Sequence, residues 1–248
     1  MDSAPVPLGD DSAQAAQALR VAFFAMATLA ELRESDTESH LLRVQRYVRV
    51  LADKLKSHPA FAPTLTQGYI DLLCASVPMY DMGTVGIPDR ILLKPGRLAP
   101  EELAIMRTHT TLGFDALVRA EKTLGQTSPL LAIAKEITLS HQEKWDGNGY
   151  PQGLAGTKIP LSARILAVAD VYDALISNKV YKQGVEHEAA VQVIFSERAS
   201  HFDPDVVDAF IEVSPEFAAI AQKYADTDAD MQKKIEYLAN AIAENAEM

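Results

Sequence analysis

The sequence predicts an all-α protein. Apolar residues recur at helical spacing along most of the chain, as in the stripe formed by Leu161, Ile165, Val168, Tyr172 and Leu175. Signals for β-strands are nearly absent, and turns rich in glycine and proline separate the helical stretches. A hydrophobic content of 48% is ordinary for a globular protein and is sufficient for a sizeable core.

The N-terminal part is predicted to hold a flexible lead-in and two helices. Residues 1–12 contain two prolines and three aspartates, and we expect them to be flexible. A helix is predicted over residues 13–35, where alanine is frequent. The next helix, over residues 36–56, places Asp36 and His40 one turn apart on the same face.

The middle of the chain is predicted to contain a structured loop between helices. Residues 78–98 hold three glycines and three prolines, which is too many for a long helix. Pro100 suits the first turn of a helix, and Ser128 followed by Pro129 suits the start of another. The predicted helices of this part cover about residues 64–77, 100–109, 112–122 and 129–143.

The C-terminal part continues the helical pattern. Further helices are predicted from Pro160 and near residues 187–197 and 204–218. In a last amphipathic helix one stripe contains Met231, Ile235, Leu238 and Ile242, a pattern more typical of core packing than of a partner helix. We therefore expect a main domain over residues 36–220, preceded by the helix over 13–35, and a C-terminal amphipathic helix within 221–248.

Charge and composition exclude some classes of protein. The formal net charge of −11 argues against non-specific binding of nucleic acid, which depends on cationic contacts to phosphates. The single cysteine, Cys74, cannot form an internal disulfide and fits a reducing cytosol. The apolar run over residues 21–30 is too short to span a bilayer, and no charged region typical of a signal peptide precedes it. We expect a cytoplasmic protein that acts away from membranes.

A polar cluster lies at the end of one predicted buried helix. The stretch over residues 139–151 reads L-S-H-Q-E-K-W-D-G-N-G-Y-P, and it places His141, Gln142 and Glu143 directly before a glycine-rich loop. Ligands and substrates are commonly held at such loops. Four more motifs accompany it: Y-D-M-G-T-V-G-I-P-D-R-I-L-L-K-P-G at 80–96, R-T-H-T at 107–110, A-D-V-Y-D-A-L at 169–175 and S-H-F-D-P at 200–204.

This collinear set of motifs resembles the HD-GYP family, from about Asp36 to Phe210. Members of that family are bacterial cyclic di-GMP phosphodiesterases with a two- or three-metal site on a helical HD-superfamily bundle. The chemistry explains the residue types, because two metals can activate water and neutralise the phosphate. Imidazole with carboxylate suits iron, manganese, zinc or nickel, and we expect iron or manganese.

The resemblance assigns metal ligands residue by residue. It implies that His40, Asp81, Asp170 and position 80 hold a first metal. It implies that Asp81, His109, His141 and position 142 hold a second, with Asp81 bridging the two. Tyr80 and Gln142 stand where the family has histidine, so each site lacks one of four ligands and reduced metal occupancy is expected.

Other positions also depart from the family pattern. Asp36 replaces a glutamate that reaches a third metal in some members. Thr84 replaces a lysine that holds the substrate phosphate, and Lys179 replaces an arginine, which removes a bidentate fork. Lys182 is retained, so the resemblance implies Lys179 and Lys182 as ligand-binding residues, with Lys182 and Asp81 taking part in catalysis.

Several polar side chains fit structural roles better than a site. His58, His187 and His201 match no ligand position of the family. We expect Asp173 to brace its helix and Arg43 to form an ion pair. Tyr80 is interpreted as a buried core residue rather than a phenolate ligand, and Trp145 and Tyr150 as residues that hold the glycine-rich loop against the domain.

Three functions remain open. The first is a degenerate family member that binds cyclic di-GMP weakly, or binds metal or a signalling partner such as a diguanylate-cyclase (GGDEF) domain. The second is a working cyclic di-GMP phosphodiesterase with a reduced metal site, and the third is a metal-free interaction module. Tyr80, Thr84 and Gln142 favour the first function over the second, and the surviving ligands disfavour the third. The sequence also leaves open a homodimer.

Overall fold

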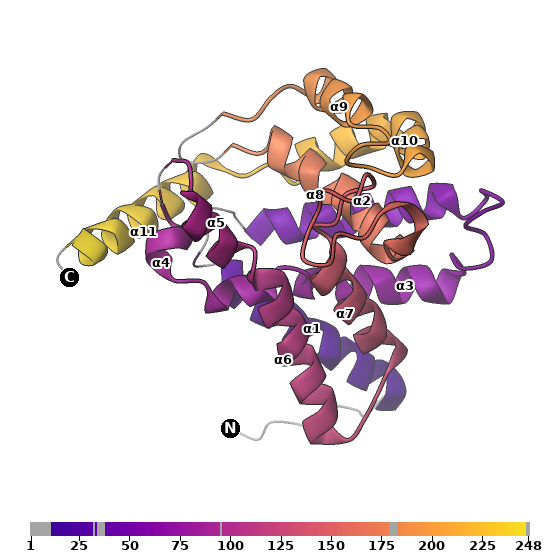
Figure 1. Cartoon of the computed structure of the whole chain (residues 1–248), viewed down its shortest axis with the longest axis horizontal. Coiled ribbons are helices and arrows are strands. Elements are labelled where there is room, and N and C mark those ends of the chain that lie inside the picture. Colours follow the sequence, from indigo (N-terminus) through magenta and orange to yellow (C-terminus); the bar gives the residue numbers. More distant parts are fainter. Residues whose placement is uncertain (1–10, 32, 34–37, 95, 179–182, 247–248) are drawn as a thin grey trace, which may run out of the picture.

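The computed structural model describes residues 11–31, 33, 38–94, 96–178 and 183–246, and the fold of these residues is helical, with no strand (Figure 1). The predicted all-α class is confirmed. The helices are α1 (Asp11–Glu31), α2 (Glu38–Leu55), α3 (Gln67–Ser76), α4 (Asp89–Leu92), α5 (Pro100–Met106), α6 (His109–Leu124), α7 (Pro129–Ser140), α8 (Leu161–Ile176), α9 (His187–Ser196), α10 (Pro204–Lys223) and α11 (Asp228–Ala246), with 3-10 helices η1 (Val77–Met79), η2 (Met82–Gly86) and η3 (Gly156–Lys158).

Helix α2 is the centre of the bundle and packs against α3, α8 and α10. Its residues Leu41, Val44, Val48, Leu51 and Leu55 recur every three or four positions and are all buried, so one face of the helix is continuous core.

Aromatic rings join α2 to the neighbouring helices. Tyr47 stacks on Phe217 of α10 with ring centroids 4.5 Å apart, and it meets Tyr172 of α8 edge-on at 5.2 Å. Stacked and edge-on ring pairs add to the stability that burial alone provides. This packing fixes α2 and α8, two of the helices that carry predicted ligands.

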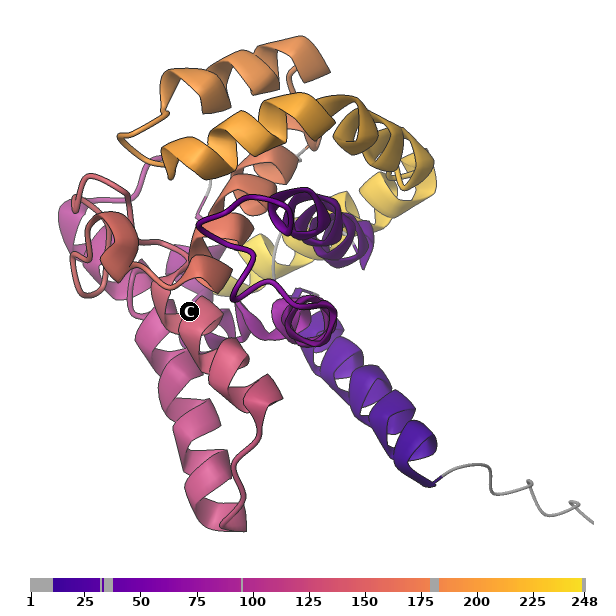
Figure 2. The same ribbon diagram turned by 90° about the vertical axis from the view of Figure 1, so that its right-hand side faces the viewer.

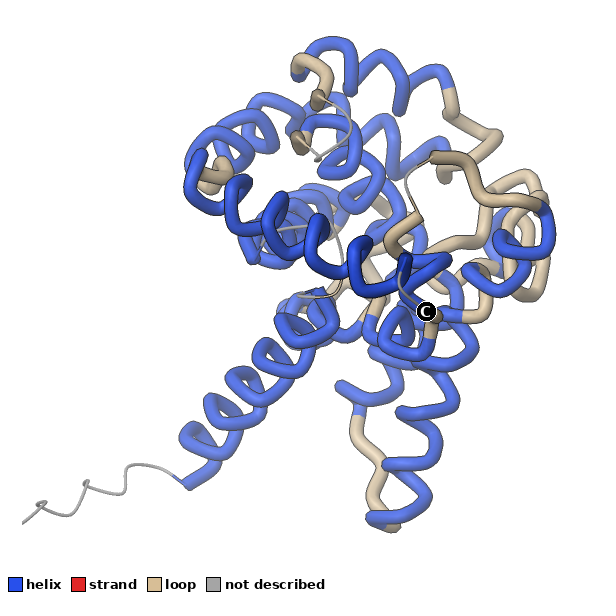
Figure 3. The backbone as a smooth tube through the Cα atoms, turned by 90° about the vertical axis from the view of Figure 1, so that its left-hand side faces the viewer, coloured by secondary structure: helices blue, strands red, loops and turns tan. Residues whose placement is uncertain are grey.

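Two helical arms project from the bundle (Figures 2 and 3). One arm is the hairpin of α6 and α7, which pack along each other. The other is α1, whose C-terminal part contacts η1 and η2. These two 3-10 helices flank Tyr80 and Asp81, so α1 lies against the segment that carries two of the predicted site positions.

Some helix ends differ from the predicted ones, for local reasons. α3 begins at Gln67 because the Thr66 side chain accepts a hydrogen bond from Tyr69 N and caps the helix. α7 ends at Ser140, so His141 to Glu143 leave the helix. α10 continues to Lys223, and the predicted boundary at residue 220 lies inside it.

The domain divisions remain predictions. Of residues 1–12, which were predicted to be flexible, 1–10 lie outside the described part of the chain, and the last two are helical because α1 begins at Asp11. Among the described residues, none of the helices has both the length and the apolar character needed to cross a bilayer.

Candidate metal centre

Asp81 lies between η1 and η2, in a turn that is held by its neighbours. The Thr84 hydroxyl donates a hydrogen bond to the Asp81 carbonyl oxygen at 2.8 Å. The Asp81 side chain is about one-third exposed, but its Oδ1 atom is buried and has no well-aligned hydrogen bond. A buried carboxylate oxygen without such a bond is costly unless a cation or a proton lies next to it.

His109 reaches Asp81 because Gly83 lets η2 approach the start of α6. A Cβ atom on Gly83 would lie 1.9 Å from the His109 carbonyl oxygen and 2.6 Å from Gly113 N, so only glycine fits there. His109 is the first residue of α6 and is buried. The close approach places its imidazole next to the Asp81 carboxylate.

His141 is positioned by α7. Ser128 caps the start of this helix by accepting a hydrogen bond from Leu131 N, and Ile133 and Ile137 bury one face in the core. The Thr138 hydroxyl donates to the Met79 carbonyl oxygen at 3.2 Å, which ties the helix to η1. His141 directly follows the helix and is buried, with its ring directed at Asp81.

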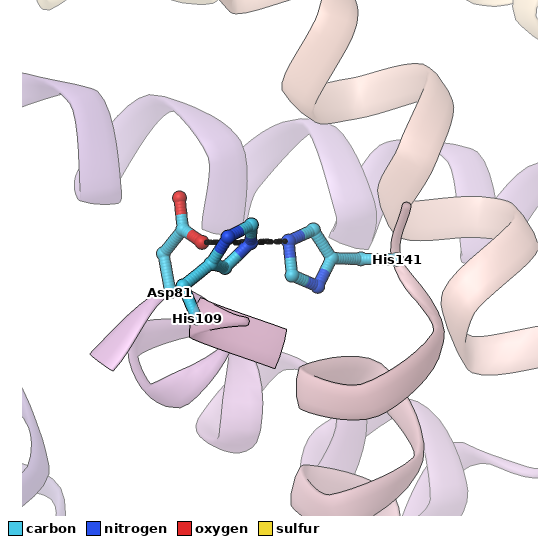
Figure 4. A group of neighbouring side chains, drawn as sticks. All are labelled: Asp81, His109 and His141. Carbon is cyan, nitrogen blue, oxygen red and sulfur yellow. Dashed lines mark hydrogen bonds and ion pairs between the residues drawn. The ribbon is translucent and has the colours of Figure 1, made fainter. Parts of the chain in front are cut away.

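The three side chains converge on one point (Figure 4). Asp81 Oδ1 lies 3.2 Å from His109 Nε2 and 3.4 Å from His141 Nε2, and the two Nε2 atoms are 3.3 Å apart. Within the described residues this is the one group of three or more His, Cys, Asp or Glu side chains arranged to hold an ion. The spacing suits a single ion bound at about 2.0–2.2 Å from each donor.

The tautomers of the two histidines also favour a cation. His109 Nδ1 lies 2.7 Å from the Met106 carbonyl oxygen, and His141 Nδ1 lies 2.9 Å from that of Ile137. A carbonyl oxygen only accepts hydrogen bonds, so both Nδ1 atoms carry the hydrogen. In the neutral rings both Nε2 atoms therefore direct lone pairs at the same point as Asp81 Oδ1, which is how metal-binding histidines are oriented.

The electrostatics agree with this arrangement. Burial opposes ionisation of Asp81, but the His141 and His109 imidazoles outweigh it and lower the pKa of the Asp81 carboxyl to about 2. Burial also opposes protonation of His141, but contact with Asp81 outweighs it and raises the pKa of His141 above its ordinary value. An ionised carboxylate is thus available at neutral pH, and a proton competes with a metal ion for His141.

The other predicted ligands, His40 and Asp170, are arranged differently. The Tyr80 hydroxyl lies between them, 2.8 Å from His40 Nε2, and it donates a hydrogen bond to Asp170 Oδ1 at 2.7 Å. The predicted set of His40, Asp81 and Asp170 is not among the groups of described residues with convergent ligand atoms. Burial and then the charge of Asp170 raise the pKa of Tyr80 well above its ordinary value, so the side chain is a phenol at neutral pH.

Behind His40 lies a buried network between α2 and α8. His40 Nδ1 lies 2.8 Å from Asp173 Oδ2, and Arg43 binds both carboxylate oxygens of Asp173, at 2.7 Å and 2.8 Å. Arg43 also donates to the Tyr224 carbonyl oxygen at 3.0 Å. The predicted structural ion pair of Arg43 is confirmed, and Asp173 joins two helices rather than bracing its own helix alone.

The loop after His141 forms one wall of the centre. Glu143 is buried and accepts hydrogen bonds from Gln152 N at 2.7 Å and Leu154 N at 2.9 Å. Gly149 approaches the backbone so closely that a Cβ atom would lie 2.3 Å from Lys144 N. These contacts place the Tyr150 ring edge-on to the His109 ring, with centroids 6.2 Å apart.

Two residues at or beside this wall, Glu143 in the loop and Arg107 at the end of α5, were not predicted to have a role. The Arg107 guanidinium lies 4.9 Å from the centroid of the Tyr150 ring, and the residue is exposed. Arg107 is thus a cation beside the centre. Its position two residues before His109 is the sequence feature from which a role could have been predicted. Glu143 follows two predicted ligand positions and precedes a glycine-rich turn. From this position its role in holding the loop backbone could have been predicted.

The remaining predicted positions are either engaged elsewhere or not described. Lys179, Lys182 and Asp36 lie outside the described residues. Gln142 is half-buried, and its backbone carbonyl accepts a hydrogen bond from Tyr150 N at 3.1 Å.

The three histidines without a predicted ligand role lie away from the three-residue group. His58 packs on Phe61 with ring centroids 4.8 Å apart, and His201 stacks on its neighbour in the sequence. His187 Nδ1 lies 2.8 Å from the Tyr172 hydroxyl. These contacts agree with the predicted structural roles.

Comparison with known proteins gives close relatives. A family model described as an HD domain matches residues 25–206. A probable cyclic di-GMP phosphodiesterase and a cyclic di-GMP phosphodiesterase, both of Vibrio cholerae, are each 51% identical to this chain, over 208 and 206 residues. The matches cover 84% and 83% of this chain but 47% and 42% of the two relatives, so the chain spans less than half of their length.

Two solved structures share the fold. An HDG"Y"P protein from Bdellovibrio bacteriovorus aligns with a TM-score of 0.55 at 17% identity, covering 80% of this chain and 64% of the other. A cyclic GMP-AMP-specific phosphodiesterase of Vibrio cholerae aligns with a TM-score of 0.54 at 16% identity, covering 90% of this chain and 59% of the other. At these identities the likeness shows the fold alone. With the family match and the signature at residues 139–151, it follows that the chain belongs to the HD domain family, in its HD-GYP form.

Proposed function

We propose that this chain is a metal-binding HD-GYP domain of bacterial cyclic di-GMP signalling in which hydrolysis is weak or absent. Its function would then be the binding of nucleotide, metal or a signalling partner. One observation carries this proposal: in the described part of the chain one set of ligands converges, Asp81, His109 and His141. Tyr80, in contrast, separates His40 from Asp170.

The donor set supports iron or manganese as the bound metal, because two imidazoles and one carboxylate leave coordination positions open. Asp81 would supply the negative charge, and the backbone carbonyls behind His109 and His141 would keep both rings oriented. A bound ion would supply activated water and neutralise phosphate charge.

Apart from a bound metal ion, the described residues of this centre provide few positive charges that could neutralise a phosphodiester. Thr84 is uncharged, so this position provides no positive charge to a phosphate. Its hydroxyl donates a hydrogen bond to the Asp81 carbonyl oxygen. Arg107 remains beside Tyr150 and is the described cation that we propose to meet a nucleotide phosphate. A transition state gains most from several fixed charges around the phosphoryl group, so the loss of one lysine and one metal would reduce hydrolysis more than binding.

A second candidate is a working phosphodiesterase with a one-metal site. The specific observation in its favour is the 51% identity to two relatives that carry that activity in their names.

We also propose that the protein is cytoplasmic. Its binding partner would be a GGDEF-type domain or a second copy of the chain, and the loop over residues 144–154 would form the contact surface.

The test combines metal analysis with nucleotide assays on the purified chain. Protein loaded with manganese or ferrous iron is desalted, its metal is counted, and cyclic di-GMP binding and hydrolysis are measured. We expect one metal per chain, nucleotide binding and little turnover. A matched pair of variants, His141→Ala and His58→Ala, locates the metal, since only the first removes a proposed ligand. Turnover equal to that of the Vibrio relatives would favour the second candidate, and absence of both metal and nucleotide would contradict both.

A further inference from the structure

Tyr80 links two side chains that could otherwise bind a metal ion. Its hydroxyl lies 2.8 Å from His40 Nε2 and 2.7 Å from Asp170 Oδ1, and the residue is 1% exposed. The oxygen thus lies within hydrogen-bond distance of one imidazole nitrogen and one carboxylate oxygen, each from a different helix. A cation bound to both groups would need the same space.

The surroundings hold this arrangement in place. On its far side His40 is bound to Asp173, which Arg43 holds through two short contacts. The Tyr80 ring packs edge-on against the His141 ring, with centroids 5.1 Å apart and planes at 88°. The ring cannot swing away without breaking core contacts, because it belongs to the main hydrophobic cluster.

We infer that the Tyr80 hydroxyl takes the place of a second metal ion and closes the His40–Asp170 half of the centre to metal. This inference rests on the proposed function, since it concerns a centre that binds one ion at Asp81, His109 and His141. A phenol oxygen and a metal ion cannot share the position, because the ion would need to lie about 2.0–2.2 Å from the same imidazole nitrogen. The hydroxyl donates its hydrogen to Asp170, and its oxygen occupies the space next to His40 Nε2.

A centre with one metal could arise for two different reasons. If the missing histidine at position 80 were the only reason, removal of the tyrosine ring would leave the metal count unchanged. If the phenol itself blocks the position, removal of the ring opens a polar space in which water can complete the coordination of an ion by His40 and Asp170. The two reasons predict different metal counts for one variant.

The experiment counts metal in variants of the full chain. Proteins are loaded with manganese, desalted and analysed by mass spectrometry of the metal, with circular dichroism to check folding. We expect one metal per chain in the wild type and also in Tyr80→Phe, because without the hydroxyl the end of the aromatic ring still lies too close to the metal position for an ion to bind. We expect two in Tyr80→Ala, and a return to one in Tyr80→Ala combined with Asp170→Asn. Tyr47→Phe is the control, since Tyr47 is another fully buried tyrosine, packed between α2 and α10.

A folded Tyr80→Ala protein that binds only one metal would overturn the inference while leaving the proposed function standing. A wild type without metal would contradict the proposed function. Even then, a gain of one ion in Tyr80→Ala would support the inference that Tyr80 closes the His40–Asp170 half of the centre to metal. Ferric iron gives a second test in the wild type, which holds even where Tyr80→Ala does not fold. A visible tyrosinate-to-iron absorption band that is lost in Tyr80→Phe would show Tyr80 to be a ligand and would overturn the inference. One bound ferric ion without that band supports it.

Discussion

Arg43 and Asp173 face each other in a buried, two-point ion pair, with Nε 2.7 Å from Oδ1 and Nη2 2.8 Å from Oδ2. Both side chains are 3% exposed or less. The pair joins α2 to α8 directly behind His40. An uncompensated charge in such a place is strongly destabilising, although the intact pair itself need not contribute much net stability.

Replacing Asp173 by asparagine should therefore destabilise the fold. The change leaves the Arg43 guanidinium buried without its main countercharge, which costs about 3–5 kcal/mol. The control is Asp208→Asn, because Arg198 and Asp208 form a pair of the same two-point geometry at the surface. That exposed pair should contribute little. Urea unfolding of the three proteins measures the difference, and equal losses in both variants would contradict the prediction.

The same pair predicts a pH dependence. Burial opposes ionisation of Asp173, but hydrogen bonds from Arg43 and His40 outweigh it and lower the pKa of the carboxyl from 3.8 to about 2. A lowered carboxyl pKa stabilises the fold above pH 3.8, and that stability is lost as the pH falls from 3.8 through 2. The expected decrease in the free energy of unfolding is about 2 kcal/mol. This decrease should be present in the wild type and absent from Asp173→Asn when unfolding is measured as the pH is lowered through this interval.

Gly83→Ala should disrupt the metal centre. The added Cβ would meet the His109 carbonyl oxygen at 1.9 Å, so either η2 or the start of α6 must move. His109 would then be displaced from Asp81, and metal affinity should fall at least tenfold, because ligand geometry controls binding. Gly68→Ala is the matched control, since a Cβ at Gly68 meets nothing within 4 Å. Metal titrations should separate the two variants, and equal affinities would show that the close approach is unimportant.

Metal affinity should decrease as the pH is lowered. Contact with Asp81 outweighs burial and raises the pKa of His141, so a proton competes with the ion for Nε2. Binding should release protons, which calorimetry in buffers of different ionisation enthalpy detects. His141→Ala should lose metal binding by about a hundredfold or more, beyond the effect of changing an outer partner. His58→Ala should bind as the wild type does.

Cyclic di-GMP affinity should be weak. By the resemblance to the HD-GYP family, Thr84 stands where a lysine of the phosphate pocket is expected and Lys179 where an arginine is expected. A charge-assisted phosphate contact contributes about 1.5–3 kcal/mol, so two weakened contacts cost on the order of a hundredfold or more in affinity. Calorimetry with and without metal measures this. Tight binding that does not depend on metal would point to a nucleotide pocket elsewhere.

Restoring three residues together should raise hydrolysis strongly. The variants are Tyr80→His, Gln142→His and Thr84→Lys, and each alone should do little for turnover, because members of one site act as a unit. Tyr80→His alone should admit a second ion without restoring the phosphate contact. The core packed around the tyrosine ring is the physical obstacle, since a smaller imidazole leaves space there. A folded triple variant that binds two metals yet hydrolyses no faster than the parent would place the lost activity in pocket shape or access.

The helical pattern of the sequence was sufficient to predict the fold class. In α2 the apolar residues from Leu41 through Val44, Val48 and Leu51 to Leu55 recur every three or four positions, and all five are buried. The resemblance of the motifs to the HD-GYP family assigned Asp81, His109 and His141, with position 142, to one metal, although they come from separate segments. Helix ends were less predictable. The helix predicted to include His141 stops at Ser140, and the helix predicted from Leu112 begins at His109.

The sequence by itself determined the all-α class, the motif positions and the residues that depart from the family pattern. Only the tertiary structure decided what Tyr80 does, because its hydroxyl meets His40 from α2 and Asp170 from α8. It also decided that Gly83 must be glycine, since the clash would come from the His109 carbonyl oxygen. Local periodicity reports which face of a helix is buried. Distances between side chains of different helices depend on how those helices pack, and no local pattern encodes that packing.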